Sequence, residues 1–399
     1  MNRQIFLTPL FLFAAASLFI GIYSGLYEPS FNNYLAQVHQ LDALARGALE
    51  FPRELPGFLI VFIFALLAFL PDTRIAMFAA FLIFISLLGQ AYLAPDMKWV
   101  IVWMLTWSTG AHLYMTLKNS ICLRLADKGH EGRLLGAIGA LESVGILLGM
   151  GVVYWGATHL DISFSVIFLI AGICALLASL SMLLIKPIPL KRPEKYLLIK
   201  RKYSLFYLLN ILFGARKQIF LTFAPWVLIK GFNCDIETFA FLGIIGTIIS
   251  LVFRPLLGRA IDSWGEKIVI SIESGLLIII CVLYGMSPLW FPARIALIII
   301  MVCYIADQLL FSVNIARATY LNRIADSQSD IAPSLSMGVT LDHGVSMLVP
   351  IAGGFLWAYS GPQWVFLAAA FIAVLNLISA LFIPDLDRSL YSTDIETVE

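Results

Sequence analysis

Charged side chains inside long apolar stretches are the residues of this sequence with the clearest capacity for chemistry. Arg216 and Lys217 lie roughly twelve residues, or about 18 Å of helix, from the start of one such stretch, which corresponds to mid-membrane depth. Asn210 shares the Lys217 face at a spacing of seven residues. Each cation costs at least about 2.5–3.5 kcal/mol at that depth unless it faces water, a carboxylate or an anion. The three residues are candidates for binding an anionic or zwitterionic small molecule; a structural ion pair with another stretch is the alternative.

A second polar face follows helical spacing around His112, and a shift of 199 positions maps it onto the stretch that contains Asp307 and Gln308. Faces that coincide under a repeat are expected to look into one shared cavity, so these three side chains are candidates for contacting the same small molecule. Asp307 is also a candidate proton carrier, or a partner for the cation at position 216 or 217. For His112 the alternative is a hydrogen bond to a neighbouring helix.

Two further cation–carboxylate sets recur under nearly the same shift. Lys118 corresponds to Arg317, and a shift of 200 positions brings Glu142 onto Asp342. This symmetry predicts one ion pair in each half, Lys118 with Glu142 and Arg317 with Asp342, in a structural or gating role. His343 follows Asp342, and a carboxylate beside an imidazole exchanges protons near neutral pH where water reaches it. Glu142, Asp342 and His343 are therefore further candidates for proton coupling.

Charges also cluster where one apolar stretch begins, near position 50. Glu50, Arg53 and Glu54 form the group, Arg46 continues it at helical spacing, and two nearby prolines loosen the backbone hydrogen bonding. Proline is tolerated in a membrane helix where neighbouring groups re-satisfy the freed carbonyls. The cluster is expected to face an outer vestibule, as an outer gate or a recruitment site, and an ion-paired helix start is the alternative.

No other constellation points to catalysis. The sequence has no GxxxxGK[ST] segment, so ATP is not expected to drive the protein directly. It shows no nucleophile, metal or cofactor pattern, and its five cysteines are odd in number without CxxC spacing. We therefore expect neither an enzyme nor a bound metal or other cofactor; an intramembrane enzyme is disfavoured.

Composition places these charges in an integral membrane protein. Sixty per cent of the 399 residues are apolar and 13% are charged, against about 45–50% and 25% in soluble proteins, and the mean hydropathy is +0.91. The net charge of +1 gives no reason to expect a nucleic-acid partner, so the expected surroundings are the lipid bilayer. A transmembrane helix needs roughly 20 apolar residues, and twelve such stretches follow one another: Phe6–Tyr27, Phe51–Leu70, Ile75–Leu93, Trp99–Cys122, Leu134–Trp155, Phe164–Ile185, Leu205–Ile229, Phe239–Leu257, Ile268–Met286, Ala293–Val313, Leu335–Tyr359 and Trp364–Ile383.

The chain divides near its middle at its longest polar interruption. The basic linker 187–203 separates an expected six-helix bundle at 1–186 from a second at 204–384, and an acidic tail follows at 385–399. Lys and Arg concentrate in the segments that share a side with this linker, which places both termini in the cytoplasm. The expected fold class is therefore an all-α integral membrane protein with twelve transmembrane helices in two pseudo-symmetric six-helix bundles.

One loop carries a resemblance to a known family. The segment 258–267, GRAIDSWGEK, resembles the loop motif G-x-x-x-D-x-x-G-x-K/R of the major facilitator superfamily, and its counterpart near Asp72 has lost the glycines. The segment 45–58 is similar to bacterial permeases of this superfamily. The resemblance implies two bundles that rock about a central cavity, with Asp262 and Lys267 as gate residues rather than substrate ligands; solvated loop charges are the alternative.

Together these features predict a monomeric secondary active transporter in a bacterial cytoplasmic membrane. We expect it to move a small anionic or zwitterionic solute by alternating access, with a proton as the default coupling ion. The alternatives are a membrane sensor or assembly factor that kept the fold without transport, and an exporter of hydrophobic or drug-like compounds.

Overall fold

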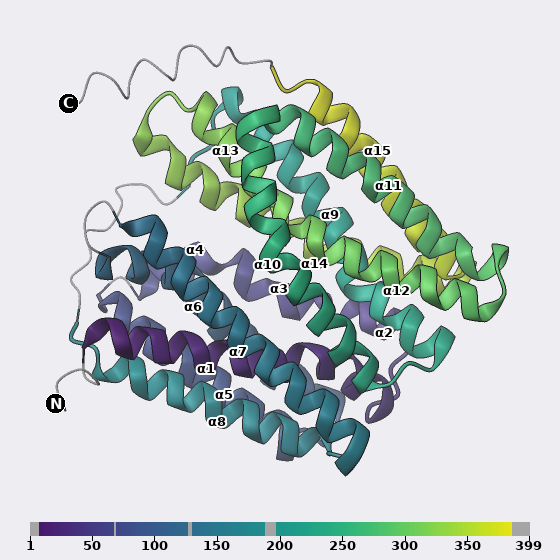
Figure 1. The fold of residues 1–399 in the computed structure, drawn as a ribbon, viewed down its shortest axis with the longest axis horizontal. Helices are drawn as coiled ribbons and strands as arrows, with labels where there is room; N and C mark the ends of the chain where they lie inside the picture. Colours follow the sequence, from purple (N-terminus) through teal and green to yellow (C-terminus); the bar gives the residue numbers. More distant parts are fainter. Residues whose placement is uncertain (1–7, 68, 127–129, 188–196, 385–399) are drawn as a thin grey trace.

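The computed structural model consists of helices that run mostly along one common direction (Figure 1). It describes residues 8–67, 69–126, 130–187 and 197–384. The first half contains α1 (Pro9–Gln37), α2 (Ala43–Ala48), α3 (Glu50–Phe58), α4 (Ile60–Leu66), α5 (Asp72–Tyr92), α6 (Met97–Leu125), α7 (Glu131–Leu160) and α8 (Phe164–Leu184). The second half contains η2 (Arg201–Tyr203), α9 (Ser204–Trp226), η3 (Val227–Gly231), α10 (Ile236–Trp264), α11 (Glu266–Trp290), α12 (Ala293–Leu310), η4 (Phe311–Val313), α13 (Asn314–Ile324), α14 (Gln328–Ser360) and α15 (Pro362–Leu381).

Nine helical segments in the described ranges are long and apolar enough to cross a membrane, with α12 and α13 counted as the single segment Ala293–Ile324. The three remaining expected spans are α6, α9 and the broken segment α2–α4, all of which carry the polar residues introduced above. Nine and three give the expected twelve spans, six in each half of the chain, and the two halves form two bundles (Figure 1). The chain is therefore a multi-pass membrane protein.

The second span differs from the single run expected at 51–70, because two short helices, α3 and α4, replace it and the short helix α2 precedes them. Pro52 and Pro56 lack the N–H groups that would bond to the carbonyls four residues earlier. Helix α3 ends at Phe58, and Leu59 leaves helical geometry with φ −87° and ψ 3° before α4 begins. Because the helix is interrupted at Leu59, the charged residues of α3 are oriented differently from how they would be in one continuous straight helix.

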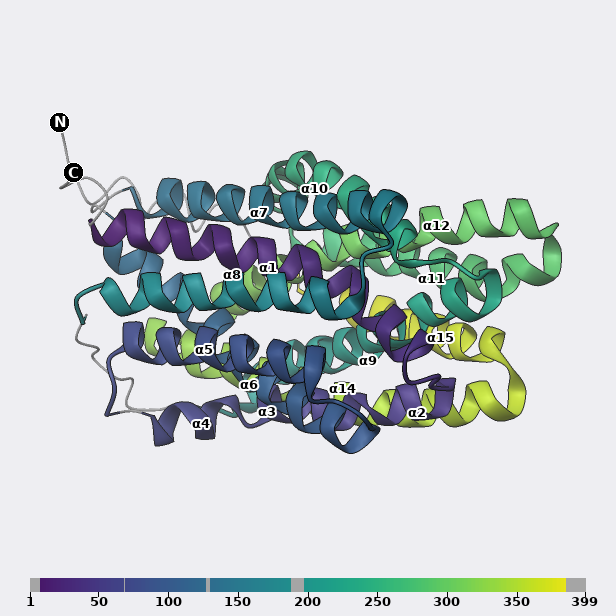
Figure 2. The same ribbon diagram turned by 90° about the horizontal axis from the view of Figure 1, so that it is seen from below.

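Glycines bring α1 and α7 into close contact in the first bundle. A Cβ at Gly25 would lie 2.1 Å from the carbonyl oxygen of Ile146, and a Cβ at Gly149 would lie 2.3 Å from that of Ile22. Small residues let helix backbones approach in this way in membranes. In Figure 2, α1 lies between α7 and α8, and it contacts both.

The two bundles touch at one end of the molecule and separate at the other. At the closed end, Gln37 Nε2 donates to Asp235 Oδ1 at 3.0 Å, and a Cβ at Gly47 would lie 2.3 Å from the carbonyl oxygen of Pro350. At the open end, where α1 begins and α15 ends (Figure 1), Gly136 of α7 and Gly258 of α10 have no heavy atom within 4 Å of an added Cβ. The structure is thus a one-sided state that is open toward the end where α1 begins.

Equivalent ion pairs express the six-plus-six repeat. Arg124 at the end of α6 contacts Asp72 at the start of α5 at 2.9 Å. Arg323, its counterpart under the 199-residue shift, contacts Glu266 at the start of α11, also at 2.9 Å. Both halves therefore contain an arginine that ties corresponding helices together at the open end of the bundle.

A charged cluster outside the spans holds the start of the second bundle. Lys200 and Lys202 bond to Asp326 at 3.1 and 2.5 Å, and Lys200 and Tyr203 bond to Asp330 at 2.5 and 2.7 Å. Hydrogen bonds from Lys202 and Lys200 hold the pKa of the Asp326 carboxyl below its usual value. These contacts attach residues 200–203 to the beginning of α14. Most of the expected linker and the whole acidic tail lie outside the described residues.

Candidate functional site

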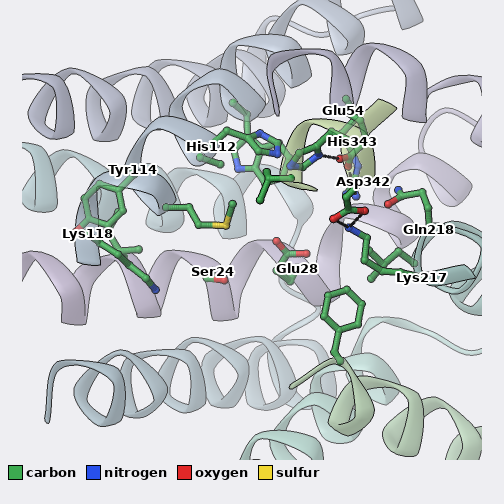
Figure 3. Close-up of a pocket in the computed structure, with 18 of the residues that line it drawn as sticks. Ser24, Glu28, Glu54, His112, Tyr114, Lys118, Lys217, Gln218, Asp342 and His343 are labelled. Carbon is green, nitrogen blue, oxygen red and sulfur yellow. Dashed lines mark hydrogen bonds and ion pairs between the residues drawn. The ribbon is translucent and has the colours of Figure 1, made fainter. Parts of the chain in front are cut away.

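A cavity of ≈ 590 Å³ lies between the two bundles and receives side chains from both (Figure 3). Helices α1, α3, α5, α6 and α7 line it from the first half, and α9, η4, α13 and α14 line it from the second. Aromatic and aliphatic residues form much of the wall. The charged residues that line it are Glu28, Arg53, Glu54, Lys118, Glu142, Lys217 and Asp342.

The two adjacent cations of α9 have separate partners. Lys217 lines the cavity and donates to both carboxylate oxygens of Asp342, at 2.8 and 2.7 Å. Arg216 points elsewhere, is 2% exposed, and pairs with Asp307 of α12. Asn210 donates within its own helix to the carbonyl of Phe206 at 2.8 Å and does not line the cavity. Only one residue of the expected anion-binding set, Lys217, therefore faces this cavity.

The predicted pair of Arg317 with Asp342 is wrong. Arg317 is 1% exposed, contacts Glu273 of α11 at 2.9 Å, and stacks over the ring of Phe213 at 4.4 Å. The repeat fails here because α9 supplies Lys217, for which the 199-residue shift gives Leu18 in α1. Asp342 is the partner of that additional cation, so Arg317 requires a different carboxylate.

The equivalent prediction for the first half is confirmed. Lys118 Nζ lies 2.9 and 2.7 Å from the two carboxylate oxygens of Glu142. Both side chains are partly exposed and line the cavity. This pair joins α6 to α7 within one bundle.

The charged cluster of α3 is buried between the bundles in this structure and does not face an outer vestibule. Glu50 is 0% exposed, pairs with Arg46 and Arg53, and accepts a hydrogen bond from Gln218 of the second half at 2.5 Å. Glu54 contacts Arg53 at 3.1 Å and His343 of the second half at 2.7 Å. The cluster lies away from a vestibule because α2 and α3 pack against α14 at the closed end. Its expected role as an outer gate stays a prediction.

The remaining predicted residues occupy three places. His112 lines the large cavity, with its ring centroid 4.8 Å from that of His343. Asp307 and Gln308 line a smaller cavity of ≈ 130 Å³ beside it. Asp262 and Lys267 lie at the open end near the turn between α10 and α11, outside both cavities. Gly265 forms that turn with φ 87°, a conformation that favours the glycine of the loop motif.

Two intramembrane carboxylates were missed from the sequence. Glu28 follows the expected end of the first span, but α1 continues through Pro29 to Gln37, so Glu28 lines both cavities. Glu273 lies inside the ninth span, where a carboxylate is by itself a signal of a buried partner. Among the described residues Glu28 has no hydrogen bond or ion pair, whereas each of the other charged residues around the large cavity has one.

Solved structures share this architecture. The nucleoside transporter NupG aligns over 95% of this chain and 100% of its own, with a TM-score of 0.76 and 16% identity. A D-xylose-proton symporter aligns over 96% of this chain and 98% of its own, with a TM-score of 0.68 and 18% identity. The xylose transporter XylE from E. coli, in a partially occluded inward open conformation, aligns over 96% of this chain and 98% of its own. Its TM-score is 0.67 and its sequence identity is 16%.

Sequence comparison gives the family. No curated protein matches the chain. The family model of the Major Facilitator Superfamily matches residues 55–332, which includes the GRAIDSWGEK loop and reaches from the broken second span to the start of α14. The chain belongs to the major facilitator superfamily.

Proposed function

We propose that this protein is a secondary active transporter that moves a small zwitterionic solute by alternating access, with a proton as the coupling ion. The observation that carries the proposal is the cavity between the bundles, which presents both signs of charge from both halves. Its ≈ 590 Å³ volume falls within the range of about 300–1,000 Å³ common for small-molecule sites.

The pairing of charges favours a zwitterion over a simple anion. Arg216 is neutralised by Asp307 outside the large cavity, so α9 offers one cation, Lys217, with Asp342 beside it. A solute with a carboxylate and an ammonium group can insert into this pair and satisfy both partners. An anion would leave Asp342 beside a second negative charge, which is costly where water is scarce.

A proton at Glu28 would couple solute movement to an ion gradient. The other coupling candidates already have partners: Asp307 with Arg216, Asp342 with Lys217, Glu142 with Lys118, and His343 with Glu54. Glu28 faces the cavity without a hydrogen bond or ion pair among the described residues. An unpaired carboxylate is easily neutralised by a proton, which lowers the cost of occluding it away from water.

The first test is a screen for the solute. Purified protein is heated in the presence of amino acids, organic anions, sugars or nucleosides, and a bound ligand stabilises it by about 2.7 kcal/mol at one hundred times its Kd. We expect stabilisation by amino acids, followed by counterflow of the same compounds in proteoliposomes. Stabilisation by sugars or nucleosides alone would overturn the zwitterion assignment. Correctly inserted protein that exchanges none of the compounds would favour a sensor.

The Lys217–Asp342 pair is tested by replacing both partners. The double variant Lys217→Met with Asp342→Asn removes both charges, so it leaves no unpaired charge buried and should fold. Counterflow should fall at least about tenfold, since a charged hydrogen bond contributes about 1.5–3 kcal/mol. Arg216→Met with Asp307→Asn is the matched control outside the large cavity and should retain counterflow. If both double variants fold and show the same rate of counterflow, neither ion pair has a specific role in binding the solute and both are only structural.

Glu28→Gln tests the coupling step. Counterflow at equal pH on both sides should persist, because exchange needs no net proton movement. Net solute movement driven by an imposed pH gradient should disappear, since an amide cannot take up the proton. Glu142→Gln, which alters a paired carboxylate, should still respond to the gradient. Gradient-driven movement by Glu28→Gln at the level of the native protein would exclude Glu28 from coupling.

Alternating access requires the open end to close, and Gly136→Leu tests this step. Position 136 faces open space in the present structure, so the variant should fold and bind solute. Transport should be lost, because closing the open end brings α7 toward α10 and the added side chain stands between them. Gly149→Leu instead meets the backbone of α1 and should fail to fold, while Gly275→Leu, also in open space, should transport normally. Normal transport by folded Gly136→Leu would show that α7 does not approach α10.

A further inference from the structure

Three side chains with metal-binding atoms meet at the closed side of the large cavity. Glu54 of α3, His112 of α6 and His343 of α14 each offer one ligand atom, and these atoms lie within 4.8 Å of one another. Figure 3 shows the two imidazoles side by side, with Glu54 next to His343. The three positions are far apart in the sequence, which is why no metal pattern was expected there.

The hydrogen bonds of His112 orient its ring for a ligand. Its Nδ1 lies 2.8 Å from the backbone carbonyl of Ser108, to which it donates. This fixes the tautomer and leaves Nε2 with a free lone pair. Histidines that bind metals are commonly held by this kind of contact, in which the second ring nitrogen donates to a carbonyl or a carboxylate.

His343 directs one ring nitrogen at the carboxylate of Glu54. Its Nδ1 lies 2.7 Å from Oε2 of Glu54, and its ring meets that of His112 edge to face. A metal ion that takes the place of the proton between these two atoms would bind both. Ligand atoms on a tetrahedral ion with bonds of about 2.1 Å lie about 3.4 Å apart. The most widely separated of the three ligand atoms need to approach by at most about 1.4 Å, and His343 Nδ1 and Glu54 Oε2 need to move apart by about 0.7 Å to admit the ion.

Gly57 makes room for the two rings. A Cβ at this position would lie 2.6 Å from His112 Nε2 and 2.8 Å from His343 Cε1. Any larger residue would displace both imidazoles from the place where they converge. The absence of a side chain at Gly57 therefore leaves the space in which two histidines from different bundles meet.

We propose that Glu54, His112 and His343 bind a divalent transition-metal ion, with Zn²⁺ as the best fit, and that the ion holds the closed end shut. Two imidazoles and a carboxylate suit Zn²⁺ and its neighbours, whereas Mg²⁺ and Ca²⁺ prefer oxygen ligands alone. The fourth position faces the cavity, where water can occupy it.

Binding would trap one conformation because the ligands come from both halves. Glu54 and His112 belong to the first bundle and His343 to the second. When the closed end opens, the two bundles separate there and the three ligands no longer meet. A ligand that binds one state better shifts the population toward that state. Zn²⁺ should therefore stabilise the present state and slow the conformational cycle.

Metal binding is tested on the purified full chain without a histidine tag and without any solute. Titration with Co²⁺ should give the visible absorption of a tetrahedral site, and calorimetry with Zn²⁺ should give one ion per chain. His112→Gln and His343→Gln should each weaken binding at least about tenfold, since loss of outer-shell partners alone costs 10–100-fold. His159→Gln is the control, because His159 is an exposed histidine near the end of α7 whose Nδ1 contacts only the carbonyl of Trp155.

Two results would overturn the site. One is Zn²⁺ affinity that is the same in the native protein, His112→Gln and His343→Gln. The other is folded native protein that binds neither metal at millimolar concentration. If a histidine variant fails to fold, Glu54→Gln, which keeps the shape of the side chain, must show the loss of affinity instead.

Trapping is measured separately across the open end. The five native cysteines are buried, so spin labels are attached to cysteines introduced at Gly132 and Gly258, where open space surrounds both positions. Zn²⁺ should leave only the long distances between the two spin labels, which correspond to the open end being wide apart. When His343→Gln is added, Zn²⁺ should not change the distribution of distances. A shift toward short distances would show that the ion favours the opposite state. Because no solute is present, failure here is distinct from failure of the transport proposal.

Discussion

The cost of charge in a low-dielectric environment is the constraint on which the rest of this structure depends. A lone ion inside the membrane is expensive, so intramembrane charges occur with partners or beside water. Helix α9 carries two cations in succession, and they recruit Asp307 and Asp342 from two different helices. This fixes how α12 and α14 face α9. The ion pairs therefore act as packing constraints on the second bundle before any solute is considered.

The same constraint distinguishes contacts within a bundle from contacts between bundles. Lys118–Glu142 and Arg317–Glu273 are each internal to one half and can persist while the halves move. The contacts from Glu50 to Gln218 and from Glu54 to His343 cross between the halves, so the proposed cycle requires them to break when the closed end opens. Glu50 keeps its ion pairs with Arg46 and Arg53 of the first half, so separation from Gln218 leaves no charge unpaired there.

The sequence allowed the fold to be predicted further than the site. Hydropathy located the spans, and the 199-residue shift relates Arg124 to Arg323, which the structure shows in equivalent contacts with Asp72 and Glu266. The shift failed where the halves differ, because Lys217 has no counterpart and redirects Asp342. Glu28 was missed because α1 runs through Pro29, which hydropathy alone does not show. Glu54, His112 and His343 come together because three helices from two bundles pack against one another. Their spacing in the sequence does not predict this packing.

Polar contacts at the closed end have a consequence for reversibility. An apolar seam between the bundles would expose apolar surface to water each time it opened, at about 25 cal/mol for each Å². The groups of α3, Gln218 and His343 can instead exchange their protein partners for water as the seam opens. The net free energy of such an exchange is only a few kcal/mol, because a hydrogen bond to a charged group contributes about 1.5–3 kcal/mol over its hydrated state. In the proposed alternating-access cycle, a seam of this kind keeps the two states close in free energy, so that a bound ligand is sufficient to choose between them.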